Sequence, residues 1–142
     1  MLATYGTYIS ILYRKASAFF NAALKPLGLS AAELPFLMTL LRKDGMSQEQ
    51  LSTLLDIDKA ATARVVRSLE RKSLVIRVKK TGDRRYNYVY LSELGRLKVA
   101  SFLPMVEEWN ALLVQGFAEE EKKQLLEHLQ KMAANVGQKN ED

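Results

Sequence analysis

The chain has 142 residues and no cysteine, and its 21 lysines and arginines exceed its 16 aspartates and glutamates, for a formal net charge of +5. This length suits one domain with a hydrophobic core, and the 48% hydrophobic and 26% charged residues are typical of a globular protein. The lack of cysteine excludes a disulfide framework, a thiolate metal site and a cysteine redox switch, and it favours a cytoplasmic location.

The first predicted element is a helix over about residues 4–24, because apolar residues recur there at helical spacing. It ends at Lys25-Pro26, since a proline disfavours helical geometry in the residue before it. The capping-box pattern Ser30-Ala-Ala-Glu33 then predicts a second helix that reaches about Lys43, with an irregular first turn caused by Pro35.

Two shorter helices follow, joined by a tight connection. Ser47-Gln-Glu-Gln50 is another capping-box pattern and predicts a third helix over about residues 48–55. Asp58 is a favourable N-cap for a fourth helix that extends to about Lys72. Two short helices with a tight junction, the second of them basic, predict a helix-turn-helix.

The next part of the chain is rich in β-branched and aromatic residues. Residues 74–80 and 86–91 are predicted strands, and Thr81-Gly82-Asp83 supplies the turn between them. A basic hairpin that directly follows a helix-turn-helix predicts a winged helix.

Two long helices complete the predicted fold. Ser92 opens a fifth helix, which Pro104 should kink, and a sixth covers about residues 119–136. The fold class is therefore mainly α with a small β-hairpin wing. We expect residues 1–142 to form a single domain, in which a winged-helix lobe at 30–91 lies between helical arms at 1–25 and 92–136, with a frayed tail at 137–142.

The positive charge is concentrated in one stretch of the sequence. Residues 59–85 hold ten basic and two acidic residues, a net charge of +8, which leaves −3 for the rest of the chain. A basic block in an otherwise slightly acidic protein indicates a surface that binds a polyanion, with nucleic acid as the first candidate. No apolar run approaches the roughly 20 residues that span a bilayer, so no membrane partner is predicted.

The predicted fourth helix has two distinct faces. The spacing of Thr62, Val65, Val66 and Leu69 turns these residues toward the core, whereas the opposite face carries basic and small side chains. We expect its N-terminal part to enter the DNA major groove, and an alternative is a solvated basic face without a partner. The predicted major-groove residues are Lys59, Ala60, Ala63 and Arg64, the predicted phosphate contacts are Arg67 and Arg71, and Ser47 completes the DNA-binding set on this lobe.

The hairpin tip supplies the remaining predicted DNA contacts, Lys79, Lys80, Arg84 and Arg85. One of the two arginines is expected to enter the minor groove, while Asp83 has a structural role and pairs with the other. Tyr86, Tyr88 and Tyr90 share one strand face. They are either a stacking platform for unpaired bases or, as is more common, cross-strand packing.

The segment Asp83-Arg-Arg-Tyr-Asn-Tyr-Val-Tyr-Leu-Ser-Glu-Leu-Gly95 resembles the wing signature of the MarR (multiple-antibiotic-resistance regulator) family, and residues 58–72 are similar to its recognition helix. The order of predicted elements resembles the family along the whole chain. Three positions depart from the family pattern. Ser92 replaces a threonine, and Ala118 replaces a residue that caps the last helix. Ser73 replaces a glycine that ends the recognition helix in the left-handed backbone conformation.

The resemblance implies a homodimer that binds a pseudo-palindromic operator on double-stranded DNA, usually as a repressor. Independently, the apolar faces of the first, fifth and sixth helices exceed what one such chain can cover, which indicates a partner surface. Family members are often released from DNA by a small aromatic or lipophilic effector. The candidate pocket residues here are Tyr8, Leu12, Lys15, Phe36 and Trp109, although aromatic residues at helical spacing are more often core.

Two other classes of function are alternatives to a DNA-binding regulator. The first is a winged helix that serves as a protein-interaction module, or as a general nucleic-acid binder without ligand response. The second is an enzyme, which is disfavoured because the sequence shows no catalytic constellation and no phosphate-binding loop. No cofactor is predicted, and the single histidine, His128, is expected at the surface rather than in a metal site.

Overall fold

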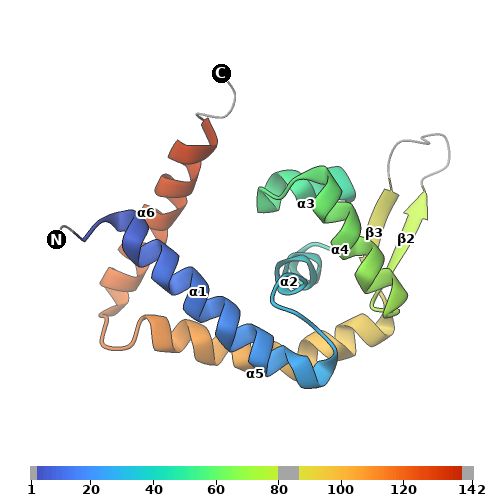
Figure 1. The fold of residues 1–142 in the computed structure, drawn as a ribbon, viewed down its shortest axis with the longest axis horizontal. Helices are drawn as coiled ribbons and strands as arrows, with labels where there is room; N and C mark the ends of the chain where they lie inside the picture. The colour runs from blue at the N-terminus through green and yellow to red at the C-terminus, as the bar shows by residue number, and fades with distance from the viewer. Residues whose placement is uncertain (1–2, 80–86, 139–142) are drawn as a thin grey trace. The chain divides into compact units, whose positions relative to one another are not determined.

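The computed structural model describes residues 3–79 and 87–138 of the chain (Figure 1). It confirms the predicted fold class, because helices dominate and the only sheet among the described residues is small. The described chain divides into two compact units, Met1–Met105 and Val106–Asp142. The elements in chain order are α1 (Tyr5–Leu24), the 3-10 turn η1 (Lys25–Leu27), α2 (Leu34–Arg42), β1 (Met46–Ser47), α3 (Gln48–Leu55), α4 (Lys59–Arg71), β2 (Val75–Lys79), β3 (Asn87–Leu91), α5 (Glu93–Leu113) and α6 (Glu119–Gln138).

Local capping signals set the starts of the helix-turn-helix. At α3 both halves of the predicted capping box form: the Ser47 hydroxyl accepts from the Gln50 amide at 3.0 Å, and the Gln50 side chain accepts from the Ser47 amide at 2.9 Å. Asp58 caps α4 by accepting from the Ala61 amide at 2.7 Å. Both predicted caps are confirmed, and both helices begin where the sequence indicated.

The second helix begins later than predicted. Residues 31–33 form a turn and α2 starts at Leu34, so Pro35 lies in its first turn, where the missing amide is tolerated. Only half of the expected capping box exists: the Glu33 carboxylate accepts from the Ser30 amide, but the Glu33 amide donates to the Ser30 carbonyl oxygen instead of its hydroxyl. The Glu33 carboxylate also accepts from Ser68 on α4 and from Lys72 directly after it, and no local pattern could indicate these partners.

The sheet has three antiparallel strands in the order β1-β3-β2. The predicted hairpin strands are confirmed, with pairing from Val75 opposite Leu91 to Lys79 opposite Asn87, and the residues between them, 80–86, lie outside the described chain. Strand β1 was not predicted, because two residues are too few to show alternation. It places Met46 opposite Val89 and so joins the start of α3 to the sheet.

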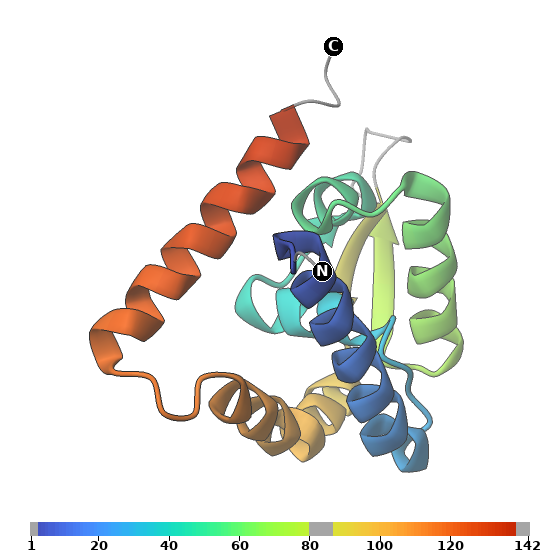
Figure 2. The same ribbon diagram turned by 60° about the vertical axis from the view of Figure 1, so that its left-hand side comes forward.

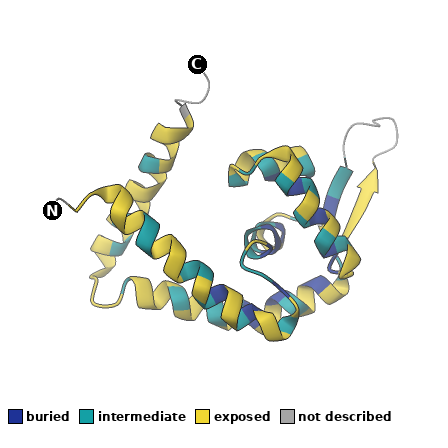
Figure 3. Ribbon diagram, viewed as in Figure 1, coloured by how far each residue is buried: buried dark blue, intermediate teal, exposed yellow. Residues whose placement is uncertain are grey.

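The core of the first unit lies where α2, α3, α4, the sheet and the start of α5 meet. Figure 3 shows buried positions concentrated on α2 and on one side of α4. The most deeply buried side chains are apolar, apart from the Thr62 hydroxyl, which donates to the Ile57 carbonyl oxygen at 3.5 Å. They are Leu24, Phe36, Leu37, Leu40, Leu51, Val66, Leu69, Leu74, Val89, Val99 and Phe102.

A tight junction ties the end of α4 to the start of α5. Ser73 adopts the left-handed conformation, with a φ of 61°, so replacement of the family's glycine leaves this geometry intact. Ser92 keeps the capping role of the family's threonine, since its hydroxyl donates to the Ser73 carbonyl oxygen at 2.6 Å and accepts from the Gly95 amide at 2.9 Å. A Cβ on Gly95 would lie 2.1 Å from the Leu74 carbonyl oxygen, so α5 can pack here only with glycine.

The second unit contains the end of α5 and all of α6. Helix α5 continues through Pro104 in the first unit and ends at Leu113. Although Ala118 offers no capping side chain, its amide donates to the Glu121 carboxylate at 2.9 Å, and α6 begins at Glu119 as predicted. Its last helical residue is Gln138, slightly beyond the predicted end. None of the helices in the described residues is long and apolar enough to cross a membrane.

Candidate nucleic-acid interface

Helix α4 presents one face to the core and a second, basic face outward. Thr62, Val66 and Leu69 are buried, and Val65 is half-buried, as their spacing predicted. Figure 2 shows α4 beside strands β2 and β3. The predicted contact residues are on that outward face: Lys59, Ala60, Arg64, Arg67 and Arg71 are exposed, and Ala63 is half-exposed.

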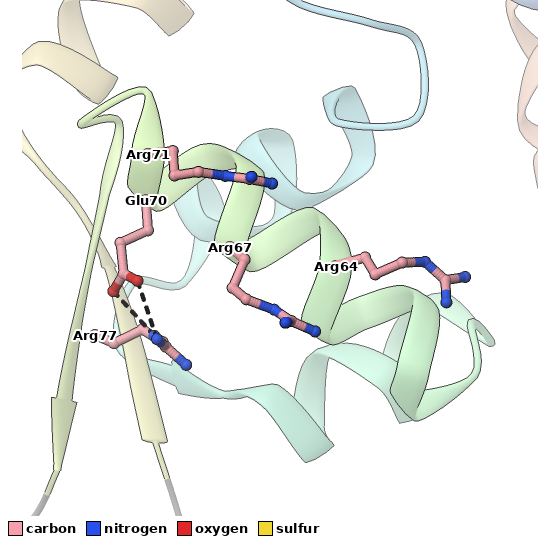
Figure 4. Close-up of a pocket in the computed structure, with 5 residues that line it drawn as sticks. All are labelled: Arg64, Arg67, Glu70, Arg71 and Arg77. Atoms are coloured by element: carbon pink, nitrogen blue, oxygen red, sulfur yellow. Dashed lines mark hydrogen bonds and ion pairs between the residues drawn. The ribbon is translucent and has the colours of Figure 1, made fainter.

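Four arginines meet in a groove of about 500 Å³ between α4 and β2, which we call the arginine groove. Arg64, Arg67 and Arg71 project from successive turns of α4 toward the same side, and Arg77 reaches in from β2 (Figure 4). Glu70 is the fifth lining residue. Arg64 also borders a second groove of about 560 Å³, between α4 and residues 28–33.

Glu70 and Arg77 form a two-bond ion pair at one edge of the arginine groove. The Arg77 Nε and Nη2 donate to the two carboxylate oxygens of Glu70, at 2.9 and 3.0 Å. These hydrogen bonds lower the pKa of Glu70 and raise that of Arg77, against a smaller opposing effect of burial. Neither residue was among the predicted site residues. Opposite charges seven residues apart, on a helix and the following strand, were the available signal.

Pairing changes which basic residues supply surface charge. Lys72 donates to the buried Glu33 carboxylate at 2.7 and 2.8 Å, and the Ser68 hydroxyl donates to the same carboxylate at 3.2 Å. Lys72 therefore has a structural role, although it was counted in the predicted polyanion-binding block. Apart from Lys72 and Arg77, the described part of the chain holds five basic residues of that block, and no described carboxylate lies within ion-pair distance of them: Lys59, Arg64, Arg67, Arg71 and Lys79.

The other predicted DNA contacts lie outside α4, at the start of α3 and in the hairpin. Ser47 is buried, and its hydroxyl caps α3. A contact between Ser47 and DNA stays a prediction. Lys79 is exposed at the end of β2. Asp83 and the other tip residues, Lys80, Arg84 and Arg85, lie outside the described residues.

The tyrosine stripe is divided between described and undescribed residues. Tyr88 lies opposite Val78 and Tyr90 opposite Ile76, on the face of β3 that points away from buried Val89. The Tyr90 ring also covers Gly45, where a Cβ would lie 2.6 Å from a ring carbon. These neighbours favour cross-strand packing over a stacking platform, while Tyr86 lies outside the described residues.

The five candidate effector-pocket residues occupy different environments. Phe36 is in the core of the first unit, whereas Tyr8, Leu12 and Lys15 are exposed on α1. Trp109 belongs to the second unit. A pocket formed by these five residues therefore stays a prediction. His128 is exposed on α6, as expected.

The comparisons with known proteins agree with this geometry. The sequence model of the MarR family matches residues 29–86. A crystal structure of a MarR transcriptional regulator from Methanosarcina mazei is 33% identical, covers 94% of this chain and 96% of its own, and superposes with a TM-score of 0.84.

Two further relatives extend the comparison. The HTH-type transcriptional regulator YdgJ of Bacillus subtilis is 31% identical over 109 residues, which are 77% of this chain and 66% of that protein. A crystal structure of a complex of S. aureus MepR with DNA has a TM-score of 0.86 at 24% identity, over 94% of this chain and 99% of the other, and shows a shared fold. The chain therefore belongs to the MarR family of transcriptional regulators.

Proposed function

We propose that this chain is a sequence-specific regulator that inserts α4 into the major groove of double-stranded DNA. The observation that carries this proposal is the outward face of α4, where three arginines without described carboxylate partners follow two alanines. Small residues allow the helix to approach base edges, and arginine can bind guanine through two hydrogen bonds. The shared fold with the DNA complex of S. aureus MepR supports this use of the lobe. Regulators of this family are not enzymes, and we propose no catalytic activity.

The position of a residue along α4 decides whether it is placed to contact a base or a phosphate. Lys59, Ala60, Ala63 and Arg64 lie in the first two turns, which are the part of a recognition helix that meets base edges. Arg67 and Arg71 follow on the same face. With a rise of about 1.5 Å per residue, Arg71 lies about 10 Å further along the axis than Arg64, which suits it for a flanking phosphate.

Replacing Arg64 with alanine should relax the sequence preference at one position of each half-site. A base-reading arginine contributes about 1–3 kcal/mol of discrimination, so affinity for the preferred operator should fall by that amount while affinity for an operator altered at the same position changes less. Titration of both duplexes with wild type and variant measures this. Arg71→Ala is the matched control and should weaken both duplexes equally. Uniform weakening by Arg64→Ala would instead favour a general nucleic-acid binder.

The active form in this proposal is a homodimer that binds a pseudo-palindromic operator. In the first unit, α1 exposes a row of large apolar side chains, with Tyr5 86% and Tyr13 73% exposed. In the second unit, Leu126, Leu129 and Val136 are exposed along α6. Exposed apolar faces of this kind are usually buried against a partner, and a second copy of the chain would bury them symmetrically. Sedimentation equilibrium should give twice the monomer mass, and a monomer at micromolar concentration would contradict the proposal.

We further propose that a small aromatic or lipophilic ligand releases the protein from DNA and that the protein acts as a repressor. A ligand can shift the separation of the two recognition helices only through a difference in its affinity for the two arrangements. The dissociation constant for operator DNA, measured with and without aromatic acids such as salicylate and benzoate, tests this. An unchanged constant with every acid counts against ligand control.

A further inference from the structure

The Glu70–Arg77 pair brings a charge from the sheet into a surface that otherwise belongs to the recognition helix. Arg77 is on β2, outside α4, yet it lines the same groove as Arg64, Arg67 and Arg71. Among these four arginines, it alone has an ion-pair partner in the described chain. Two hydrogen bonds to one carboxylate hold its guanidinium in one orientation, whereas Arg67 donates one longer hydrogen bond, from Nε to the Ala63 carbonyl oxygen at 3.4 Å.

The geometry leaves part of the Arg77 guanidinium available for a ligand. A guanidinium has five N–H groups in one plane, and the bonds to Glu70 use one on Nε and one on Nη2. Three N–H groups remain, two of them on Nη1. In Figure 4 the free end of the group points away from Glu70, and the Arg67 side chain extends to the same side. The Arg77 side chain is 33% exposed, so a ligand can reach it.

The charge of the groove identifies the class of ligand. Four arginines and one glutamate give a formal charge of +3, and guanidinium groups match the oxygens of a phosphate in geometry as well as charge. An acidic side chain beside a DNA-binding face repels phosphate, so Glu70 weakens binding unless it has another effect. Holding Arg77 in a fixed orientation is such an effect, because less side-chain entropy is then lost when a phosphate binds.

We propose that Arg77 binds a phosphate of the DNA backbone beside the major groove and that Glu70 is its positioning residue. This inference rests on the proposed function, because the phosphate belongs to the duplex that α4 reads. It adds a contact from the strand that leads into the wing. The interface then includes a backbone anchor that does not depend on the hairpin tip.

The test is a double variant, Glu70→Gln with Arg77→Gln, which removes the pair and leaves the net charge unchanged. Each phosphate neutralised contributes about −0.9 to the slope of log K against log salt concentration. The variant should therefore show a slope shallower by about 0.9 for each chain bound. Its affinity at physiological salt should be weaker by roughly tenfold per chain, the value of one charge-assisted hydrogen bond.

A matched control separates this effect from the loss of any exposed ion pair. Lys122 and Glu119 form a pair at 2.9 Å on α6, and the double variant Glu119→Gln with Lys122→Gln should keep the wild-type slope. If wild type binds with a steep slope and the Glu70–Arg77 variant matches it, the inference is wrong and the proposed function stands. A wild-type chain that binds no duplex overturns both.

The single variant Glu70→Gln tests whether Glu70 positions Arg77, and this test can be made even if the double variant does not fold. Removal of a negative charge next to DNA should tighten binding if Glu70 only repels phosphate. If Glu70 positions Arg77, the looser arginine offsets that gain, and the variant should bind operator no more tightly than wild type. Severalfold tighter binding would contradict the positioning role.

Discussion

Replacing Glu33 with alanine is expected to lower the free energy of unfolding by roughly 3 kcal/mol, the lower end of the cost of breaking a buried ion pair. Glu33 is 3% exposed and accepts hydrogen bonds from Ser30, Ser68 and Lys72. The alanine leaves these donors without their shared acceptor. The decrease in the free energy of unfolding should lie at the lower end of that range because Lys72 is 37% exposed and can be hydrated.

Urea unfolding at one fixed protein concentration measures this change, since dimerisation makes stability depend on concentration. Glu107→Ala, at an exposed position on α5, is the control and should stay within about 0.5 kcal/mol of wild type. A Glu33→Ala variant as stable as that control would show that the network contributes nothing to the fold.

Replacing Gly95 with alanine should destabilise the protein by about 3 kcal/mol, at the upper end of overpacking costs. The added Cβ would lie 2.1 Å from the Leu74 carbonyl oxygen, which is backbone and cannot rotate away. That carbonyl also accepts from the Ser92 amide at 3.0 Å, so moving it disrupts the α4–β2–α5 junction. Helix α5 would have to shift away from the DNA-binding lobe.

Thermal unfolding of Gly95→Ala beside Gly6→Ala provides the comparison. A Cβ on Gly6 meets only the Thr4 hydroxyl, at 3.9 Å, and this glycine has no positive φ. Alanine there should leave stability unchanged or raise it slightly, because alanine favours helices. Equal melting temperatures for the two variants would show that the close approach at Leu74 is easily relieved.

Patterns confined to a few neighbouring residues predicted most of this fold. The Ser47–Gln50 box, the Asp58 cap and the burial of Thr62, Val66 and Leu69 on α4 all follow from local spacing, and the structure confirms them. The outward basic face of α4 was predictable for the same reason. Once one side of a helix is apolar, the opposite side is fixed by the 3.6-residue repeat.

Features that depend on distant partners were not predictable in this way. Lys72 lies 39 residues from Glu33, and their contact gives a structural role to a lysine that the sequence pattern assigns to the basic surface. Strand β1 exists because Met46 pairs with Val89, far along the chain. The Glu70–Arg77 pair depends on how β2 leaves α4, which a count of charges along the sequence does not contain.

The most direct test of the account is titration of wild-type protein with a duplex that it has itself enriched from random DNA. We expect a pseudo-palindrome bound at least about a thousandfold more tightly than its shuffled sequence, at fixed physiological salt. Between about 50 and 200 mM salt, affinity for both should fall steeply, since several phosphates are neutralised. Equal affinity for the enriched and shuffled duplexes would contradict the central claim that the outward face of α4 reads DNA sequence.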